Sequence, residues 1–382
     1  MFKSLITMFV LLILCIGNIS FTASAQDDDC FADLDILTTS DGIEYVRTPD
    51  ACFENLVDWD YEPKYLEIDG LRQAYVDEGP SDADPILLLH GQPSWSYLYR
   101  YMIPVLVDGG HRVIAMDHLG MGRSDKPIDV EYHTFENHVN RLEAFITELE
   151  LDNLTLFAQD WGSVIGLYSA GINPDLYARI VLGNGGLPVV EEVAPFPDDI
   201  DASNLAFDQL ISFIPPNQPP FFDEEGNSLL PSNGGVDGGF GQWAAYALYF
   251  EDFRPSKMVE ALTYDALTPE ELQAYDAPFP TEITMAGPRS FPNLLNTLVG
   301  VLEPAQEGLL TYDKPFLTIF GGNDPGLAGE ADVQDELIET IPGAEGQAHH
   351  RFPDASHFLQ DDKGEEIAGM VNQFIADNPI EG

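Results

Sequence analysis

The sequence has 382 residues, 45% of them hydrophobic and 11% aromatic. This excludes a disordered chain and suffices for one large core with an inserted lid. With 65 acidic against 16 basic residues, the formal net charge is −49, which disfavours nucleic-acid binding through a basic face because phosphates would be repelled. Self-repulsion is screened at high ionic strength, so the composition favours a host in saline surroundings.

The first residues have the pattern of a targeting segment. Lys3 precedes an apolar run over residues 9–16, and Ala23-Ser24-Ala25 offers the small residues that a signal peptidase cuts after. We predict a signal peptide at 1–25, an exported periplasmic or secreted protein, and no membrane contact after cleavage. The alternative is a retained membrane anchor, for which the apolar run is short.

Cysteine usage fits export. Cys15 leaves with the predicted signal peptide, so Cys30 and Cys52 remain. Two cysteines in an oxidising compartment can form a disulfide, and the alternative is a pair of free thiols. One sequence does not fix the distance between them.

After an acidic leader at 26–45, short apolar runs alternate with amphipathic ones. Buried strands are predicted at residues 86–89, 113–116, 154–158, 180–182 and 316–320. Helices are predicted at 137–149 and 164–170. This alternation is typical of an α/β fold with a mostly parallel sheet and helices on both faces.

Residues 188–286 interrupt that alternation. Pro-Pro pairs and a Gly-rich stretch at 234–241 mark loops, and amphipathic segments at 243–250 and 255–262 and a helix start at Pro269 follow. We predict a mainly helical cap at 188–286, inserted between core segments 46–187 and 287–382.

His90-Gly91-Gln92-Pro93 directly follows the predicted strand 86–89. In sheets of this kind, such a loop gives one backbone N–H to an oxyanion hole, and the residue after the nucleophile gives another. These would be the amides of Gln92 and Trp161. His90 is expected to support the turn.

The strongest motif is Ala158-Gln159-Asp160-Trp161-Gly162. A buried strand runs into it and a helix leaves it, and small residues two before and two after Asp160 fit a sharp strand-to-helix turn. This is typical of the nucleophile elbow of the α/β-hydrolase fold, with aspartate in place of serine. An ionised carboxylate can attack carbon without a base. The alternative is an ordinary helix N-cap.

Two further residues complete a triad in the order nucleophile, acid, histidine. Asp324 lies in the loop after strand 316–320, and His357 lies before a helix-like C-terminal segment. His357 would activate water, and Asp324 would fix its tautomer. Their alternatives are a turn aspartate and a surface histidine. No cluster has the spacing of a metal site, and no cofactor is expected.

A halide leaving group needs hydrogen-bond donors in a dry pocket, and the indole N–H is such a donor. Trp161 adjoins the predicted nucleophile and Trp243 begins an amphipathic cap segment, and these are two of only four tryptophans. Each by itself is more typical of a packed core.

Together these residues resemble the haloalkane dehalogenases. The matching segments are 46–50, 90–100, 117–127, 159–162, 277–280, 287–292 and 356–360, which span almost all of the chain after the leader. The resemblance implies hydrolysis of a small halogenated aliphatic substrate by water. An alkyl-aspartyl ester forms on the way, and the products are an alcohol, a halide ion and a proton.

The resemblance also assigns a branch. One branch places a glutamate after the sixth strand, where this chain has Leu182-Gly183-Asn184-Gly185. The other places an aspartate after the seventh strand and holds the halide with two tryptophans. Asp324 and Trp243 are similar to that second branch, which makes Trp161 and Trp243 the halide clamp.

Two departures from the family pattern concern Gln92 and the cap. Gln92 stands where this branch has glutamate and the other asparagine, and its amide can donate to halide or hold the nucleophile. The cap carries extra Pro- and Gly-rich material around 197–238, which leaves pocket size open.

Two other functions stay open at this point. An epoxide hydrolase shares the aspartate nucleophile but needs cap donors, usually two tyrosines, and Tyr246, Tyr249, Tyr264 and Tyr275 are available. Trp243 and the segments 277–280 and 287–292 favour dehalogenation. A periplasmic ligand-binding scaffold without catalysis is the other alternative, and an intact triad argues against it.

Overall fold

The computed structural model describes residues 30, 34–189, 244, 247–249, 253–324 and 331–380. The predicted signal peptide, Trp243, Tyr246 and most of the first two thirds of the predicted cap lie outside the described residues. Within the described part, no helix is both long and apolar enough to cross a membrane.

The described strands form a large sheet and a small one. The strands are β1 (Leu37–Thr38), β2 (Glu44–Val46), β3 (Lys64–Ile68), β4 (Leu71–Glu78), β5 (Pro85–Leu89), β6 (Arg112–Met116), β7 (Lys126–Pro127), β8 (Leu154–Ala158), β9 (Tyr177–Leu182), β10 (Phe316–Gly321) and β11 (His350–Phe352). The large sheet has the order β11-β10-β9-β8-β5-β6-β4-β3, and β1-β2-β7 form the small one.

From β6 to β11, neighbouring strands of the large sheet run parallel, and β4 and β3 are added antiparallel at one edge. Parallel neighbours must be joined by crossovers, which here contain helices. The loops after β5, β8, β9 and β10 therefore emerge at the same edge of the sheet. The residues predicted to carry chemistry lie in these loops.

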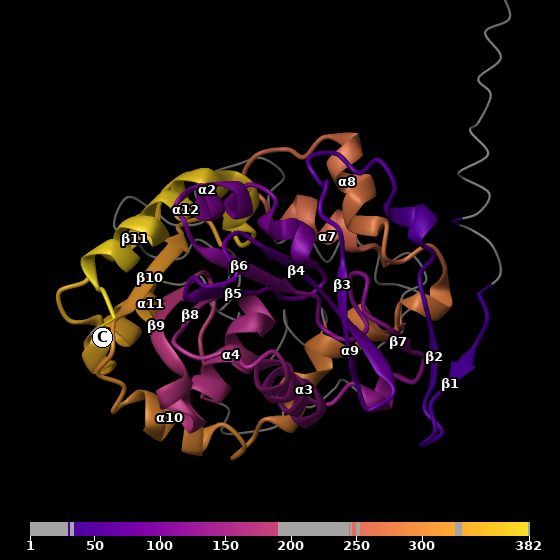
Figure 1. Cartoon of the computed structure of the whole chain (residues 1–382), viewed down its shortest axis with the longest axis horizontal. Helices are drawn as coiled ribbons and strands as arrows, with labels where there is room; N and C mark the ends of the chain where they lie inside the picture. Colours follow the sequence, from indigo (N-terminus) through magenta and orange to yellow (C-terminus); the bar gives the residue numbers. More distant parts are fainter. Residues whose placement is uncertain are drawn as a thin grey trace, which may run out of the picture.

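Helices cover both faces of the sheet. They are α2 (Met102–Asp108), α3 (Phe135–Glu148), α4 (Asp160–Ile172), α7 (Pro255–Ala261), α8 (Pro269–Asp276), α9 (Ala286–Leu294), α10 (Glu303–Leu309), α11 (Ala331–Thr340) and α12 (Leu359–Asp377). In Figure 1, α2 and α12 lie together above the sheet, and α3, α4 and α10 lie below it.

Strand β5 shows why the two faces need separate cores. Its five residues are all buried, and successive side chains of a strand point to opposite faces. Ile86 and Leu88 belong to the core under α2 and α12, whereas Leu87 and Leu89 belong to the core under α3 and α4. A strand buried on both faces reads as an unbroken apolar run, which is how the sequence predicted it.

The predicted α/β architecture is confirmed. Each of the five predicted strands lies inside an observed strand, and residues 137–149 and 164–170 coincide with most of α3 and α4. In the cap region, α7 and α8 begin at Pro255 and Pro269. The sequence analysis did not predict β3 and β4, which form a hairpin.

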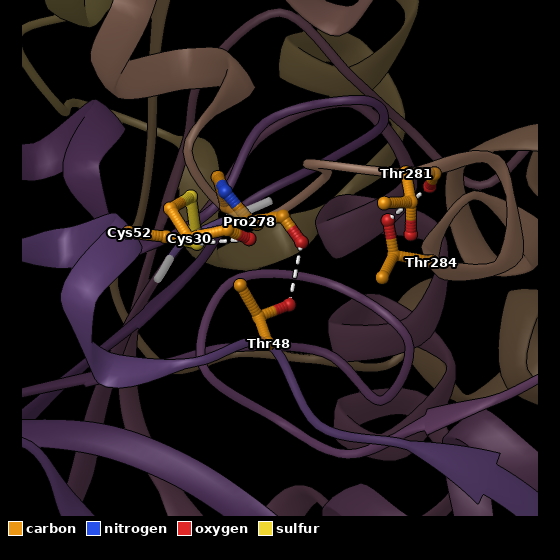
Figure 2. Close-up of a disulfide and its surroundings, with 6 residues drawn as sticks. All are labelled: Cys30, Thr48, Cys52, Pro278, Thr281 and Thr284. Atoms are coloured by element: carbon orange, nitrogen blue, oxygen red, sulfur yellow. Dashed lines mark hydrogen bonds between the residues drawn. A yellow bond between two sulfur atoms is a disulfide. The ribbon is translucent and has the colours of Figure 1, made fainter. Parts of the chain in front are cut away.

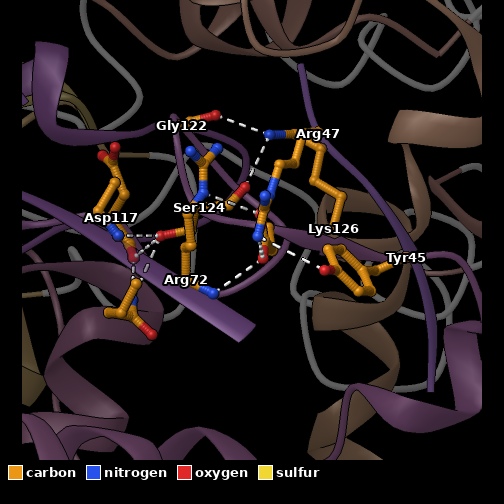
Figure 3. Close-up of polar contacts among 10 residues, drawn as sticks. Tyr45, Arg47, Arg72, Asp117, Gly122, Ser124 and Lys126 are labelled. Carbon is orange, nitrogen blue, oxygen red and sulfur yellow. Dashed lines mark hydrogen bonds and ion pairs between the residues drawn. The ribbon is translucent and has the colours of Figure 1, made fainter. Parts of the chain in front are cut away.

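Part of the predicted leader is built into the fold. Strand β1 pairs with β2, and β2 pairs with β7. Next to β2, Arg47 donates from Nε to Asp125 Oδ1 at 2.7 Å, and the Arg72 backbone N–H donates to Asp125 Oδ2 at 2.8 Å (Figure 3). The leader is therefore attached to the core by the pairing of β2 with β7, beside which the buried Asp125 holds Arg47 and Arg72.

A disulfide joins Cys30 to Cys52. Beside it, the Thr48 hydroxyl donates to the Pro278 carbonyl at 2.7 Å (Figure 2). Pro278 follows α8 within the predicted cap. This hydrogen bond from Thr48 thus connects the predicted core to the predicted cap.

A buried arginine lies between two carboxylates beneath α8. Arg100 donates from Nη2 to Glu271 Oε1 at 2.7 Å, and its Nη1 lies 2.6 Å from Asp361 Oδ1. The hydroxyls of Tyr101 and Tyr275 donate to Glu271 and Asp361. We call these five residues the arginine cluster. It connects the loop after β5 to α8 and to α12.

Candidate active site

The turn between β8 and α4 presents Asp160 in a strained conformation. Its φ of 50° lies in the left-handed region, which non-glycine residues rarely adopt. The Asp160 backbone N–H donates to the Asn184 carbonyl at 2.8 Å. A Cβ on Gly162 would overlap the Leu89 carbonyl oxygen, so only glycine lets the helix start this close to β5. This is the geometry of a nucleophile elbow.

One oxygen of the Asp160 carboxylate is held by the loop after β5. The Gln92 backbone N–H donates to Oδ1 at 2.7 Å. A Cβ on Gly91 would overlap the Asp160 side chain, so glycine is needed for this close approach. The structure thus brings together Asp160 and the Gln92 amide, as the sequence predicted.

The other oxygen faces His357. The Nε2 atom of His357 lies 3.4 Å from Asp160 Oδ2, and its Nδ1 lies 2.8 Å from Asp324 Oδ2. All three predicted triad residues therefore meet at the carboxyl edge of the sheet. The contact with Asp324 fits the tautomer that carries its proton on Nδ1 and leaves Nε2 facing Asp160.

Backbone contacts fix the two loops that carry this pair. The Gly322 N–H donates to the Phe352 carbonyl at 2.7 Å, and the Asn323 N–H donates to the Ala355 carbonyl at 2.9 Å. The Ser356 hydroxyl donates to the Asn323 carbonyl. The acid loop and the histidine loop are thereby held in register, so the pair does not depend on its own contact alone.

The electrostatics of His357 are dominated by its two acidic neighbours. Burial lowers the pKa of His357, but the negative charge of Asp324 and the hydrogen bond to Asp160 outweigh it and raise the pKa to about 10. With both carboxylates ionised, the imidazolium form is therefore favoured. Any chemistry that needs a neutral imidazole must first remove one of these charges.

Asn184 connects the parts of the site and was missed by sequence reasoning, which noted only that this position offers no acid. Besides accepting from Asp160, it accepts from the Gly321 N–H through Oδ1 at 2.6 Å and donates through Nδ2 to the Ser356 carbonyl at 3.0 Å. This buried side chain links the elbow, the acid strand and the histidine loop. No pattern within one sequence could have identified it.

Gln159 was also missed. It lies next to the elbow aspartate and is fully buried, and its Nε2 lies 3.0 Å from His357 Nε2 and 3.1 Å from the His357 carbonyl oxygen. In the sequence, only its position directly before Asp160 could have indicated a role in the site.

The predicted halide donors are only partly described. Trp161 is buried in the first turn of α4, and its ring meets that of Phe291 edge to face at 5.9 Å. Trp243 lies outside the described residues. The Gln92 side chain donates from Nε2 to the Pro288 carbonyl at 2.7 Å, which a glutamate at this position could not do while ionised.

His90 lies beneath the site, where it supports the turn. Its Nε2 accepts the His118 backbone N–H at 3.0 Å, and its Nδ1 lies 2.8 Å from the Gly91 carbonyl. Burial lowers its pKa to about 4, so the ring is neutral near pH 7. Among the described residues, no group of three or more His, Cys, Asp or Glu side chains has the arrangement of a metal site.

Three of the four tyrosines that an epoxide hydrolase could use, Tyr249, Tyr264 and Tyr275, lie in the described part of the chain. The Tyr275 hydroxyl donates to Asp361 Oδ2 at 2.7 Å within the arginine cluster. Tyr249 is 61% exposed. Tyr246 lies outside the described residues. Tyr264 is partly buried, and its backbone N–H donates to Asp362 Oδ1 at 2.9 Å. Among the three described tyrosines, the contact of Tyr275 with Asp361 argues against its use as a donor to an epoxide.

Comparison with known proteins extends this picture. Residues 84–364 match the family model of the alpha/beta hydrolase fold. A haloalkane dehalogenase from Psychrobacter cryohalolentis is 38% identical over 349 residues, 88% of this chain and 100% of the relative. Another, from Mycolicibacterium paratuberculosis, is 39% identical and covers 85% of this chain and 96% of its own length.

A comparison with solved structures leads to the same family. The tetrameric haloalkane dehalogenase DpaA from Paraglaciecola agarilytica superposes with a TM-score of 0.70 at 28% identity, covering 89% of this chain and 100% of that one. Because such relatives span most of its length and share its fold, the chain belongs to the haloalkane dehalogenases, hydrolases of the α/β-hydrolase fold that act on carbon–halide bonds.

Proposed function

We propose that Asp160 is the nucleophile of this haloalkane dehalogenase. Its Oδ2 attacks the carbon that bears the halogen, a C–O bond forms as the carbon–halogen bond breaks, and the halide leaves with the bonding electrons. The observation that carries this proposal is the strained elbow, which exposes an aspartate whose Oδ1 is already held by the Gln92 amide. A fixed carboxylate loses little entropy on reaching the transition state.

His357 then acts as the base that hydrolyses the ester. It takes a proton from water, the hydroxide adds to the Asp160 carbonyl carbon, and the negative charge develops on the oxygen that the Gln92 N–H holds. We assign a second donor to the Trp161 amide. Collapse of this intermediate releases the alcohol and restores the carboxylate, and the proton on His357 passes to solvent.

Alkylation of Asp160 favours the neutral form of His357, which is the form that can act as a base. In the free enzyme, Asp160 and Asp324 both raise the pKa of His357. Ester formation removes the charge of Asp160, so burial and the remaining Asp324 set the balance and the pKa falls. The neutral imidazole that hydrolysis needs is then favoured in the intermediate.

For the halide we propose the clamp of the second family branch. The indole N–H groups of Trp161 and Trp243 would donate to the departing anion, and the Gln92 amide has a second N–H besides the one that it donates to Pro288. The buried position of Trp161 next to the nucleophile supports this role. Donors in a dry pocket stabilise an anion far better than donors in water.

We also propose that the mature enzyme is exported, works in saline surroundings, and binds neither nucleic acid nor membrane. The sequence of residues 1–25, the disulfide and the net charge of −49 support this setting. Transit through an oxidising compartment is what a disulfide requires.

The test is halide and proton release from 1-bromobutane. Asp160→Asn is expected to lower turnover by about 10⁴-fold or more, because the amide is a poor nucleophile. Asp332→Asn is the matched control, since Asp332 also lies in the first turn of a helix but is exposed on α11. Full halide release by Asp160→Asn would contradict the proposal.

A further inference from the structure

The base of the proposed mechanism has a third polar neighbour besides its two carboxylates. Gln159 is fully buried at the end of β8, and its side-chain nitrogen lies 3.0 Å from His357 Nε2. The Asp160 oxygen is farther from that ring nitrogen, at 3.4 Å. His357 Nε2, which must accept a proton from water, is therefore closer to the Gln159 amide than to the Asp160 carboxylate.

The His357 carbonyl fixes which end of the amide faces the ring. Gln159 Nε2 lies 3.1 Å from that carbonyl oxygen, which can only accept a hydrogen bond. Rotating the amide by 180° would bring its oxygen against the carbonyl oxygen. Its N–H groups would then point where Oε1 now finds no partner in the described part of the chain. The observed orientation is therefore the favoured one, and it presents two N–H donors to His357.

This orientation matches only one protonation state of the ring. A neutral imidazole with its proton on Nδ1 can accept an N–H from Gln159 at Nε2, whereas an imidazolium would bring two hydrogens into conflict. Among the described residues, the charged groups that face His357 are Asp160 from α4 and Asp324 from the loop after β10. Both favour the imidazolium, and Gln159 opposes them in the same direction as burial.

Resting on the function proposed above, we propose that Gln159 is a positioning residue that holds the His357 ring by two hydrogen bonds and favours the neutral base needed for hydrolysis of the ester. Its effect falls on the second chemical step. Once the ester has removed the charge of Asp160, only Asp324 still favours the imidazolium, and the amide helps to decide the balance. The first step needs no base, so halide release in the first turnover does not depend on Gln159.

The test begins with a spectroscopic measurement that a merely structural role would not change. In the Asp160→Asn background, an uncharged side chain of the same shape imitates the ester, and the His357 signal in ¹⁵N-histidine spectra is assigned by its loss in His357→Phe. Adding Gln159→Met is expected to raise the His357 pKa by about one unit, because a donor to the neutral form is lost. Adding Gln159→Glu is expected to raise it further.

Kinetics in the otherwise native enzyme give the second readout. Gln159→Met should release its first equivalent of halide at the wild-type rate, accumulate the ester, and move the pH dependence of alcohol release about one unit upward. Gln159→Glu should slow alcohol release near pH 7 on the order of 10²-fold. Gln334→Met is the matched control, because it removes a buried amide that donates to Thr318 Oγ1 and the His350 carbonyl instead.

An unchanged His357 titration and an unchanged pH profile in Gln159→Met would overturn the role of Gln159 alone. A wild-type enzyme that releases no halide from 1-bromobutane would instead contradict the proposed function. The two failures are thus separated by the behaviour of the wild type.

Discussion

Two buried clusters of this protein have the same layout, a cation between two carboxylates, and they serve different ends. In the site, His357 lies between Asp324 and Asp160, and in the arginine cluster Arg100 lies between Asp361 and Glu271. Histidine exchanges its proton near neutral pH, whereas arginine does not. The same charge pattern can therefore perform acid–base chemistry in one place and only hold the structure in the other.

The hydrogen-bond partners of the carboxylates also differ between the two clusters. Each carboxylate of the arginine cluster also receives a tyrosine hydroxyl, and Glu271 closes the capping box of α8 with Thr268. In the site, Asp160 Oδ2 has, among the described residues, only the 3.4 Å contact with His357. A carboxylate oxygen without a strong partner is left free to attack substrate, which is what a nucleophile needs and a structural ion pair does not.

The largest expected effect comes from removing the titratable cation. His357→Gln should lower steady-state turnover by about 10³-fold or more, because no base activates water. One equivalent of halide should still be released per enzyme, since the first step uses only Asp160. Rapid-mixing measurements of bromide release check this, and a variant that turned over at the wild-type rate would break the comparison.

Removing the permanent cation should act on stability. Arg100→Met leaves Glu271 and Asp361 buried without a cation, which should lower the free energy of unfolding by about 3–5 kcal/mol. The protein that remains folded should keep its halide burst and its pH profile. Urea unfolding and burst kinetics on the same sample measure both. A changed pH profile with unchanged stability would reverse the two assignments.

A smaller effect is expected for Glu271→Gln. Burial raises the pKa of Glu271, but hydrogen bonds from Thr268, Arg100 and Tyr101 outweigh it and lower the pKa to about 2. Because the folded pKa is depressed, the contribution of Glu271 is present above its ordinary value of 4.5 and is lost as pH falls toward 2.

After allowance for solvent screening, Glu271→Gln should lower the free energy of unfolding by about 1–2 kcal/mol at pH 7. The gap from wild type should narrow as the pH falls below 4.5. Denaturant unfolding at several pH values measures this gap. A gap that widened in acid would contradict the assignment.

The smallest expected effect is that of salt, which should act on the charged surface and not on the two buried clusters. The net charge of −49 repels itself at low salt, so Tm should rise by several degrees between about 0.05 and 1 M NaCl. The two clusters are buried and little screened, so Arg100→Met should have the same effect on stability at both salt concentrations. A Tm independent of salt would remove the argument for saline surroundings.

Much of this fold could be predicted because each signal was local. Unbroken apolar runs identify strands such as β5 and β8, since both their faces are covered, and the small residues around Asp160 indicate the elbow. Chain order then placed Asp324 and His357 in the right loops. Each of these inferences needs only a short stretch of sequence.

What could not be predicted depends on contacts across the sheet. Asn184 and Gln159 act through residues more than a hundred positions away, and an amide in one sequence carries no sign of its partner. The arginine cluster could not be predicted from the sequence for the same reason. The β3–β4 hairpin was missed because its partly exposed residues lack a continuous apolar run.

The central claim is that Asp160 forms a covalent bond to the substrate carbon. It is tested most directly by mixing His357→Gln with 1-bromobutane and measuring the mass of the peptide that contains Asp160. We expect that peptide to gain one butyl group on the aspartate, in step with one equivalent of bromide released. Bromide release without this adduct, or a butyl group attached to another residue, would contradict the account.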